Sequence, residues 1–327
     1  MASISILAVE GGLYSNITAL CDALFIADLW HRKVTGTGSQ FFKTRVITMD
    51  GRPVEACGGF TITPDCSIND IARSDYIIIS PQMPHLTAMP DGLDRLRQRL
   101  ETLMAEGAVV ATVCTGSFLL AEMGLLDDRR ATTNLQFARM FRKRYPRVIL
   151  ESSQMLVKTG NIITTGAVTA VYNLILHMIR DLSSPELATI VSKALLIDDS
   201  RQDQTPYALF SPAKKHGDAQ VLDAQEFIEK EFSTIKSTEE IAREVGVSPR
   251  HFIRRFKKAT GEPPLKYLQQ IRIEKAKEKL QTTRDTVDEI TWAVGYQDIS
   301  SFGRLFKQHT KLSPKAYRDK FSPPGSS

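Results

Sequence analysis

The C-terminal third of the chain contains one pattern of residues twice. The two copies are 49 residues apart up to a glycine and 50 residues apart after it, so one residue is inserted in the turn. A repeat that carries a helix, a glycine turn and a second helix is typical of paired helix-turn-helix units. We therefore expect an all-α C-terminal domain that can read two stretches of a DNA groove. The repeated residues are Ile241, Val245, Gly246, Phe252, Phe256, Lys257, Thr260, Pro264 and Tyr267, which recur as Ile290, Val294, Gly295, Phe302, Phe306, Lys307, Thr310, Pro314 and Tyr317.

In the first copy, the helix expected to enter the groove follows Gly246. This glycine ends a short helix that Ser237 is expected to cap, and Ser248 is predicted to cap the next helix. In that next helix Phe252 and Phe256 are four residues apart, so both should face the core. Its other faces are basic, and the helix contains no acidic residue. A solvated basic face is the alternative interpretation, but the glycine turn and the repeat favour a groove-reading helix.

The residue types on the two helices suggest which of them meet bases. Arginine can bind guanine through two hydrogen bonds in the major groove, whereas lysine is better suited to phosphate. Arg250 and Arg254 lie near the start of the first helix, the end that enters a groove first. Ser300 and Arg304 repeat this spacing in the second copy, where Asp298 is expected to cap the helix. These four are our candidates for contacts to base edges. The candidates for contacts to the DNA backbone are Lys257, Lys258 and Lys307.

One long helix is expected between the two copies, over residues 264–282, and it would fix the distance between them. Its charged residues, Arg272 and Lys277 among them, are expected to stay in water. The second copy closes with the pattern Gly295-Tyr296, Ser301-Phe302, Phe306-Lys307 and Ser313-Pro314-Lys315-Ala316-Tyr317-Arg318. With this pattern, residues 219–327 resemble the DNA-binding domain of the AraC/XylS transcription regulators. The resemblance implies double-stranded DNA as a partner.

The positive charge is confined to the same part of the chain. The formal net charge is +5, and residues 219–327 hold 20 Lys and Arg against 15 Asp and Glu. Residues 1–218 hold 22 against 22. A basic excess in one domain is expected if only that domain meets phosphates. A length of 327 residues also favours two domains.

Short apolar runs alternate with helical stretches in the N-terminal two thirds. This alternation predicts an α/β domain, a flavodoxin-like layer sandwich with a mainly parallel sheet. We assign residues 1–199 to this domain, the polar run 200–218 to a linker and residues 219–327 to the DNA-binding domain. The expected strands are 4–9, 44–49, 76–80, 108–113 and 162–166, and the expected helices are 17–33, 92–106, 118–123, 168–180 and 185–197.

Cys114 lies directly between an expected strand and an expected helix. A sharp turn at this point would expose its side chain above a helix N-terminus, which favours a thiolate. The alternative is a buried structural cysteine. The stretch Val113-Cys114-Thr115-Gly116-Ser117, with Gly124-Leu125-Leu126 and Arg130-Ala131-Thr132-Thr133 after it, resembles the PfpI/ThiJ-like members of the class I glutamine amidotransferase superfamily. Together with the AraC-like domain, the chain resembles a GlxA-type regulator over almost its full length.

The chain departs from the enzymes of this superfamily, which use the cysteine with a histidine and a carboxylate. No carboxylate lies between Glu10 and Asp22, and Asn134 follows Ala-Thr-Thr where relatives often have histidine. A thiol without a positioned base is poorly equipped for acyl transfer. His85 and His177 are the candidate bases, and each is more readily explained as structural or solvated. We therefore expect no catalytic residue, and a cysteine-dependent hydrolase or hydratase fused to a DNA-binding domain is the alternative.

We expect the turn at Cys114 to serve as a ligand pocket of a sensor domain. Amides at the start of a helix can hold a small anion, and open α/β sheets bind ligands at their carboxyl edge. Glu10 could pair with an amine, so the expected effector is a zwitterion such as an amino acid or a methylated amine, in line with the GlxA-type resemblance. A domain that serves only for assembly is a further alternative. The expected pocket residues are Glu10, Gly11, Pro81, Met83, Cys114, Thr115, Gly116 and Asn134.

The remaining expectations concern partners and location. No cofactor or metal site is expected, because the four cysteines show no paired spacing. The N-terminus lacks the features of a signal peptide, and polar residues interrupt the apolar run 108–126, so we expect a cytoplasmic protein without a membrane span. The resemblance implies a homodimer through the α/β domain. It also implies RNA polymerase as a partner if the protein is an activator, which is the sign of regulation that we expect.

Overall fold

The apolar runs of the N-terminal unit form one seven-stranded sheet in the order β10-β11-β7-β6-β1-β2-β5. This computed structural model describes residues 1–82 and 89–323. Neighbouring strands of the sheet are parallel, except for the antiparallel pair β10 and β11. The sheet is therefore mainly parallel, as predicted. Its strands are β1 (Ala2–Leu7), β2 (Phe42–Thr48), β5 (Cys66–Ser67), β6 (Tyr76–Ile79), β7 (Val109–Thr112), β10 (Leu156–Thr159) and β11 (Ile162–Thr165).

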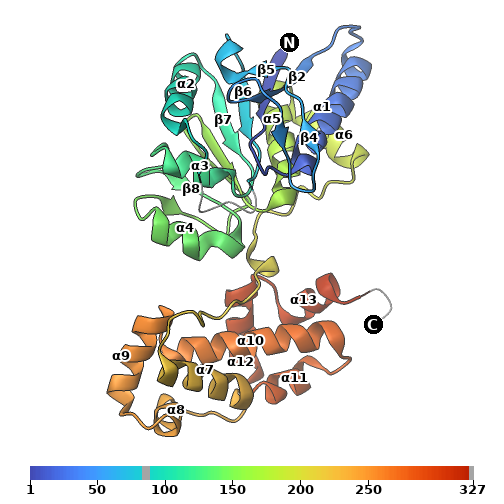
Figure 1. The fold of residues 1–327 in the computed structure, drawn as a ribbon. Coiled ribbons are helices and arrows are strands. Elements are labelled where there is room, and N and C mark those ends of the chain that lie inside the picture. The colour runs from blue at the N-terminus through green and yellow to red at the C-terminus, as the bar shows by residue number, and fades with distance from the viewer. Residues whose placement is uncertain (83–88, 324–327) are drawn as a thin grey trace. The chain divides into compact units, whose positions relative to one another are not determined.

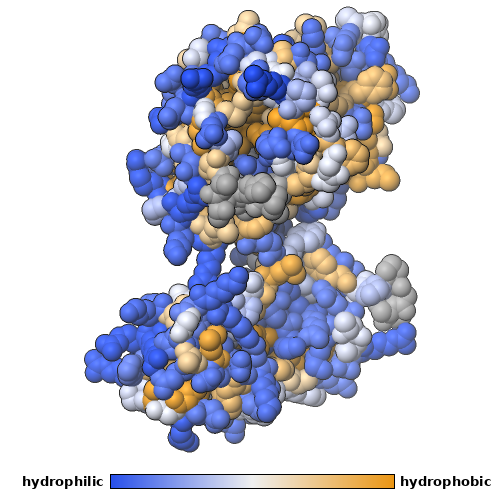
Figure 2. Space-filling model, in the orientation of Figure 1, coloured by the Kyte–Doolittle hydropathy of each residue, from blue (hydrophilic) through white to orange (hydrophobic). Residues whose placement is uncertain are grey.

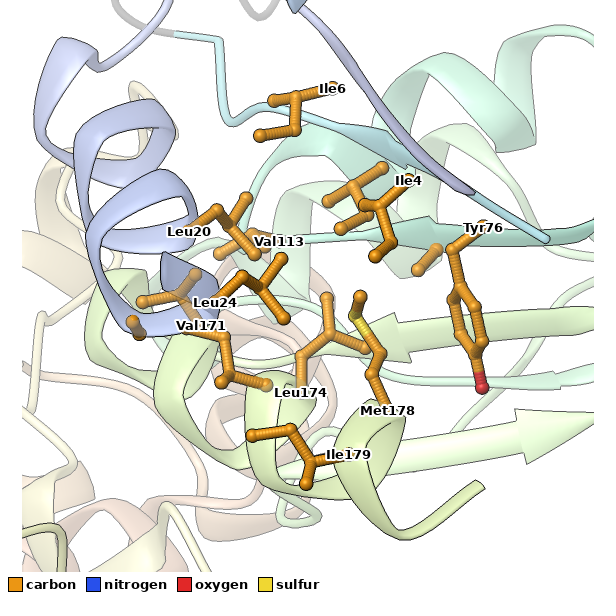
Figure 3. Close-up of a cluster of buried hydrophobic side chains, with 14 of the residues drawn as sticks. Ile4, Ile6, Leu20, Leu24, Tyr76, Val113, Val171, Leu174, Met178 and Ile179 are labelled. Carbon is orange, nitrogen blue, oxygen red and sulfur yellow. The ribbon is translucent and has the colours of Figure 1, made fainter. Parts of the chain in front are cut away.

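Helices cover both faces of this sheet (Figure 1). On one face, side chains of α1 and α5 pack against β1 and form a buried apolar cluster with Tyr76 and Val113 (Figure 3). A second apolar cluster lies on the other face. The predicted layer sandwich is confirmed. The helices of the first face are α1 (Tyr14–Thr35), α5 (Val171–Leu182) and α6 (Pro185–Ala194), and those of the second are α2 (Leu93–Ala105), α3 (Gly116–Glu122) and α4 (Ala138–Arg144).

Several short elements were not predicted, because two or three residues carry no periodic pattern. They are the hairpin β3 (Val54–Glu55) and β4 (Thr61–Ile62), the parallel pair β8 (Arg130–Ala131) and β9 (Ile149–Leu150), and the 3₁₀ turns η1 (Ile68–Asp70), η2 (Leu135–Phe137) and η4 (Thr205–Tyr207). The helix predicted over 168–180 begins with a further 3₁₀ turn, η3 (Val168–Ala170), and continues as α5.

The C-terminal unit is all-α, as predicted, and the repeat is visible in its packing. Phe256 and Tyr267 have ring centroids 5.4 Å apart, and Phe306 and Tyr317 repeat this distance of 5.4 Å. Each set belongs to its own buried apolar cluster. The helices are α7 (Ala219–Glu231), α8 (Thr238–Glu244), α9 (Pro249–Thr260), α10 (Pro264–Thr282), α11 (Val287–Ala293), α12 (Ile299–Thr310) and α13 (Pro314–Phe321).

The polar run 200–218 does not behave as the linker that we predicted. The chain divides between Gln204 and Thr205 into two compact units. Gln204 is buried in the first unit, and in the second unit the ring of Phe210 lies 5.7 Å from that of Tyr267. Polar composition was misleading here, because the polar side chains of this run find buried partners.

A membrane-spanning helix requires a long and continuously apolar segment. Among residues 1–82 and 89–323, no helix meets that requirement.

Candidate functional site

The first helix-turn-helix unit consists of α8, the turn at Gly246 and α9. Phe252 and Phe256 of α9 are buried, and Gly246 has the left-handed φ of +69° that ends α8. Ser248 occupies the N-cap position of α9, but its side chain makes no capping hydrogen bond, in contrast to our prediction. The candidate DNA contacts of this unit, Arg250, Arg254, Lys257 and Lys258, are all exposed. The helix therefore presents four cations on the side away from its phenylalanines.

The second unit, α11 and α12, repeats this arrangement with fewer charges. Phe302 and Phe306 are buried, and the predicted cap is confirmed, because Asp298 accepts a hydrogen bond from the Ser301 amide at 2.7 Å. Ser300, Arg304 and Lys307 are exposed. Arg304 Nη2 also donates to Ser301 Oγ at 3.1 Å, which directs the guanidinium along the outer face of α12.

Arg272 in α10 ties the long helix to the segment that precedes the first unit. Its guanidinium donates to the carbonyls of Phe232 and Ile235 at 2.8 and 2.7 Å and lies 5.2 Å from the centroid of the Tyr296 ring. Arg272 is half-buried, whereas Lys277 is buried and donates to the Ala208 carbonyl at 2.8 Å. Our prediction that these two side chains stay in water was wrong. Because Tyr296 belongs to the second helix-turn-helix unit, these contacts help to fix the spacing between the two helix-turn-helix units.

At the end of β7, Cys114 forms the sharp turn that we predicted. Its φ of +55° lies in the left-handed region, which residues other than glycine rarely adopt. The thiol is only 2% exposed, and Asn134 Nδ2 donates to Sγ at 3.4 Å. Burial raises the pKa of the Cys114 thiol, and hydrogen bonds from Asn134 and Thr115 offset only part of that rise. The structure thus places a buried thiol here and not the exposed thiolate that we expected.

Of the two amides that we assigned to an anion, those of Thr115 and Gly116, the second is already occupied. Gly116 N donates to the Val113 carbonyl at 2.9 Å, and the Thr115 hydroxyl donates to the Gln82 carbonyl at 2.8 Å. At the same edge of the sheet, the Gly11 amide donates to Glu55 and the Pro81 carbonyl accepts from Leu13. Met83 and His85 lie outside the described residues. The expected pocket residues share one edge of the sheet, but most of their polar groups are paired.

In the part of the chain that the structure describes, no acid or base is placed to activate the thiol. Within residues 1–82 and 89–323, no carboxylate or imidazole makes a hydrogen bond to Cys114 Sγ. His177 lies on α5, half-buried, and burial lowers the pKa of its imidazole. In the same described ranges, no group of three or more histidine, cysteine, aspartate or glutamate residues could hold a metal ion.

A cavity lies elsewhere on the carboxyl edge of the sheet, beyond β1 and β2. It has a volume of about 670 Å³, and Glu10 is the one residue lining it among the expected pocket residues that the structure describes. Its apolar wall includes Val9, Val54 and Leu96. Asp50, Asp91, Asp94 and Arg95 supply further charged groups. A cavity with an apolar wall and both signs of charge suits a small zwitterion.

Two protein families match the two units of the chain. A family described as a helix-turn-helix domain matches residues 241–320, and the DJ-1/PfpI family matches residues 37–181. The chain joins a DJ-1/PfpI domain to an AraC-type helix-turn-helix domain. The predicted resemblance is therefore confirmed for both parts.

Relatives share this arrangement over most of their length. The HTH-type transcriptional regulator CdhR of Pseudomonas aeruginosa is 26% identical over 314 residues, which cover 95% of this chain and 90% of CdhR. The HTH-type transcriptional regulator GbdR of the same species is 24% identical over 86% of this chain and 76% of its own length. The HTH-type transcriptional regulator GlxA of Rhizobium meliloti is 27% identical over 67% of this chain and 68% of its own length.

Solved structures show the same fold for the first unit. A putative transcriptional regulator from Vibrio parahaemolyticus has a TM-score of 0.51 at 20% identity, and covers 59% of this chain and 98% of its own. An AraC family transcriptional regulator from Pseudomonas putida has a TM-score of 0.50 at 17% identity, and covers 60% of this chain and 100% of its own.

Proposed function

We propose that the chain is a sequence-specific, DNA-binding transcription regulator. The observation that carries this proposal is the pair of equivalent helices, α9 and α12, which expose arginine and lysine opposite buried phenylalanines. Helices of this kind enter the major groove with their first turns against base edges. Arg250, Arg254, Ser300 and Arg304 occupy those turns, and Lys257, Lys258 and Lys307 lie farther along, where they can hold phosphates.

Arg254→Ala is expected to weaken binding to a specific site by about 1–3 kcal/mol, because a bidentate contact to guanine is lost. Binding to random DNA should change much less. Lys258→Ala is the matched control, and it should weaken both kinds of binding similarly. It should also lower the slope of log affinity against log salt concentration by about one. The probes are double-stranded sites that the unaltered protein selects from a random library, and the measurement is a titration at several salt concentrations. Equal losses from Arg254→Ala on selected and random DNA would contradict its role.

We propose that the N-terminal unit, residues 1–204, senses a small molecule without converting it. The Cys114 thiol is buried, and no base among residues 1–82 and 89–323 makes a hydrogen bond to it, which argues against nucleophilic catalysis. The cavity beside Glu10 supports ligand binding, since its volume falls within the range of sites for small molecules. Carboxylates of Glu10 and Asp94 suit a cationic amine, and Arg95 suits a carboxylate. An amino acid or a methylated amine has this combination of groups.

The effector proposal is tested with the full chain in a thermal-shift screen of amino acids and methylated amines. For a compound that stabilises the protein, Glu10→Gln is expected to reduce the affinity about tenfold or more, because a charge-assisted hydrogen bond is lost. Cys114→Ser is the control and should leave the affinity unchanged. If Cys114→Ser removes binding and Glu10→Gln does not, the ligand binds at the cysteine turn.

We propose that two copies associate through α1 of the first unit. Phe25 is 60% exposed and Leu29 is 46% exposed, one helical turn apart. Figure 2 shows apolar residues on the side of this unit where α1 and α6 lie. A twofold axis between the two residues would place Phe25 of one copy against Leu29 of the other, because antiparallel helices pair in reverse order. The same pairing brings the exposed Asp22 of one copy beside Lys33 of the other, at the basic end of its α1.

Replacing Phe25 and Leu29 together with aspartate is expected to convert the protein to monomers, because like charges then face each other in a desolvated contact. Light scattering after gel filtration measures the mass. Ile149→Asp is the matched control, since Ile149 is 54% exposed on β9 and lies away from α1. A double variant that keeps the mass of the unaltered dimer would exclude α1 as the interface.

A further inference from the structure

The two DNA-reading helices differ at one equivalent position. The repeat places Ile253 of α9 and Gly303 of α12 each directly after a buried phenylalanine. Both lie one turn after the first base-edge candidate of their helix, next to Arg254 and Arg304 respectively. Residues at i, i+3 and i+4 share one side of a helix, so each position belongs to the candidate DNA face.

Nothing in the described part of the protein requires a glycine at position 303. Its φ is not in the left-handed region, and a Cβ atom built there would meet no other atom within 4 Å. Glycine inside a helix lowers the stability of that helix relative to alanine. Helix α12 therefore contains a destabilising residue that its packing does not require. Glycine at such a place allows another molecule to approach the backbone closely.

At the equivalent position of α9, Ile253 is also unfavourable, because its side chain is large and apolar on an exposed helix face. Ile253 is 40% exposed, although it is a large apolar side chain surrounded by Arg250, Arg254 and Lys257. A β-branched residue also has a lower helix propensity than the unbranched polar residues that normally cover a wet helix face. In the major groove, an apolar side chain can contact the methyl group of thymine.

We propose that this position sets how each helix meets DNA, which rests on the proposed DNA-binding function. Gly303 lets the backbone of α12 approach the DNA surface closely, so that the short side chain of Ser300 reaches a base edge. Ile253 holds α9 farther out and contacts a thymine methyl group between the two arginines. The two halves of the site are thus read differently, one by close backbone approach and one by an apolar contact.

Two variants place the same side chain at the two equivalent positions. Gly303→Ala adds a methyl group, and it is expected to raise the melting temperature by about 4 °C while it weakens binding to the selected DNA site about tenfold. Gly303→Leu should weaken binding further. Ile253→Ala removes the apolar contact and keeps the helix. Melting is followed by circular dichroism, and affinity is measured by titration on sites selected from a random library by the unaltered protein.

Thymine methyl groups are tested directly by replacing single thymines of the selected site with uracil. One such replacement is expected to weaken the unaltered protein about three- to fivefold, the value of one buried methyl group, and to leave Ile253→Ala unaffected. A Gly303→Ala protein that binds the selected site as tightly as the unaltered protein overturns the close approach of α12. Uracil replacements without effect at every thymine overturn the role of Ile253. Failure of the unaltered protein to select any sequence would instead refute the DNA-reading function itself.

Discussion

Gly295→Ala is expected to destabilise the C-terminal unit by about 3 kcal/mol. Gly295 has a φ of +86°, where a side chain costs about 1–2 kcal/mol. A Cβ atom would also overlap the carbonyl group of Ser233, and backbone cannot move aside as a flexible side chain can. Overlap of this kind typically costs about 1–3 kcal/mol more. Urea unfolding of the full chain in a Trp30→Phe background, followed by circular dichroism and by the fluorescence of Trp292, measures the loss.

The first repeat supplies the control for this prediction. Gly246 occupies the equivalent turn with a φ of +69°, but a Cβ atom there would meet nothing within 4 Å. Gly246→Ala should therefore cost only the backbone strain of about 1–2 kcal/mol. Equal losses from the two alanine variants would show that the contact with Ser233 is unimportant.

The repeat explains why so much of the C-terminal unit could be predicted from the sequence. Phe252 and Phe302, with the glycines of the two turns, are local signals that fix the helices and their buried sides. The sequence did not show that Arg272 would be half-buried. Its partners, two carbonyl groups of another segment, carry no residue pattern, and a basic side chain on a helix normally stays in water.

In the N-terminal unit, the strands and helices were predicted better than the ligand site. Alternating strands and helices identify a mainly parallel sheet, and the turn at Cys114 follows from the end of β7. Whether its thiol would be exposed depends on packing from distant segments, such as the hydrogen bond from Asn134. The cavity beside Glu10 is likewise lined by α2 and by the loop after β2, which only the folded sheet brings together.

Gln204 was assigned to a linker, yet its replacement is expected to have one of the largest effects on the first unit. The side chain is buried, and its Nε2 lies 3.0, 3.1 and 3.0 Å from the carbonyl oxygens of Thr133, Ser152 and Gln154. It also fills the space beside Gly166, where a Cβ atom would overlap it. Polar composition concealed this role, because a buried amide and a solvated amide look alike in a sequence.

Gln204→Ala should lower the free energy of unfolding of the first unit by about 3 kcal/mol. The substitution leaves a cavity and removes the two N–H donors that the amide offers to these carbonyls, and each buried group left unsatisfied costs about 1–3 kcal/mol unless water replaces the amide. Trp30 is the one tryptophan of the first unit, so its fluorescence in a Trp292→Phe background reports urea unfolding of that unit. Gln202→Ala is the matched control, since Gln202 is exposed, and it should cost less than about 0.5 kcal/mol. If both alanine variants unfold at the same urea concentration, then residues 200–204 are a free linker, and the buried position of Gln204 contributes nothing to the first unit.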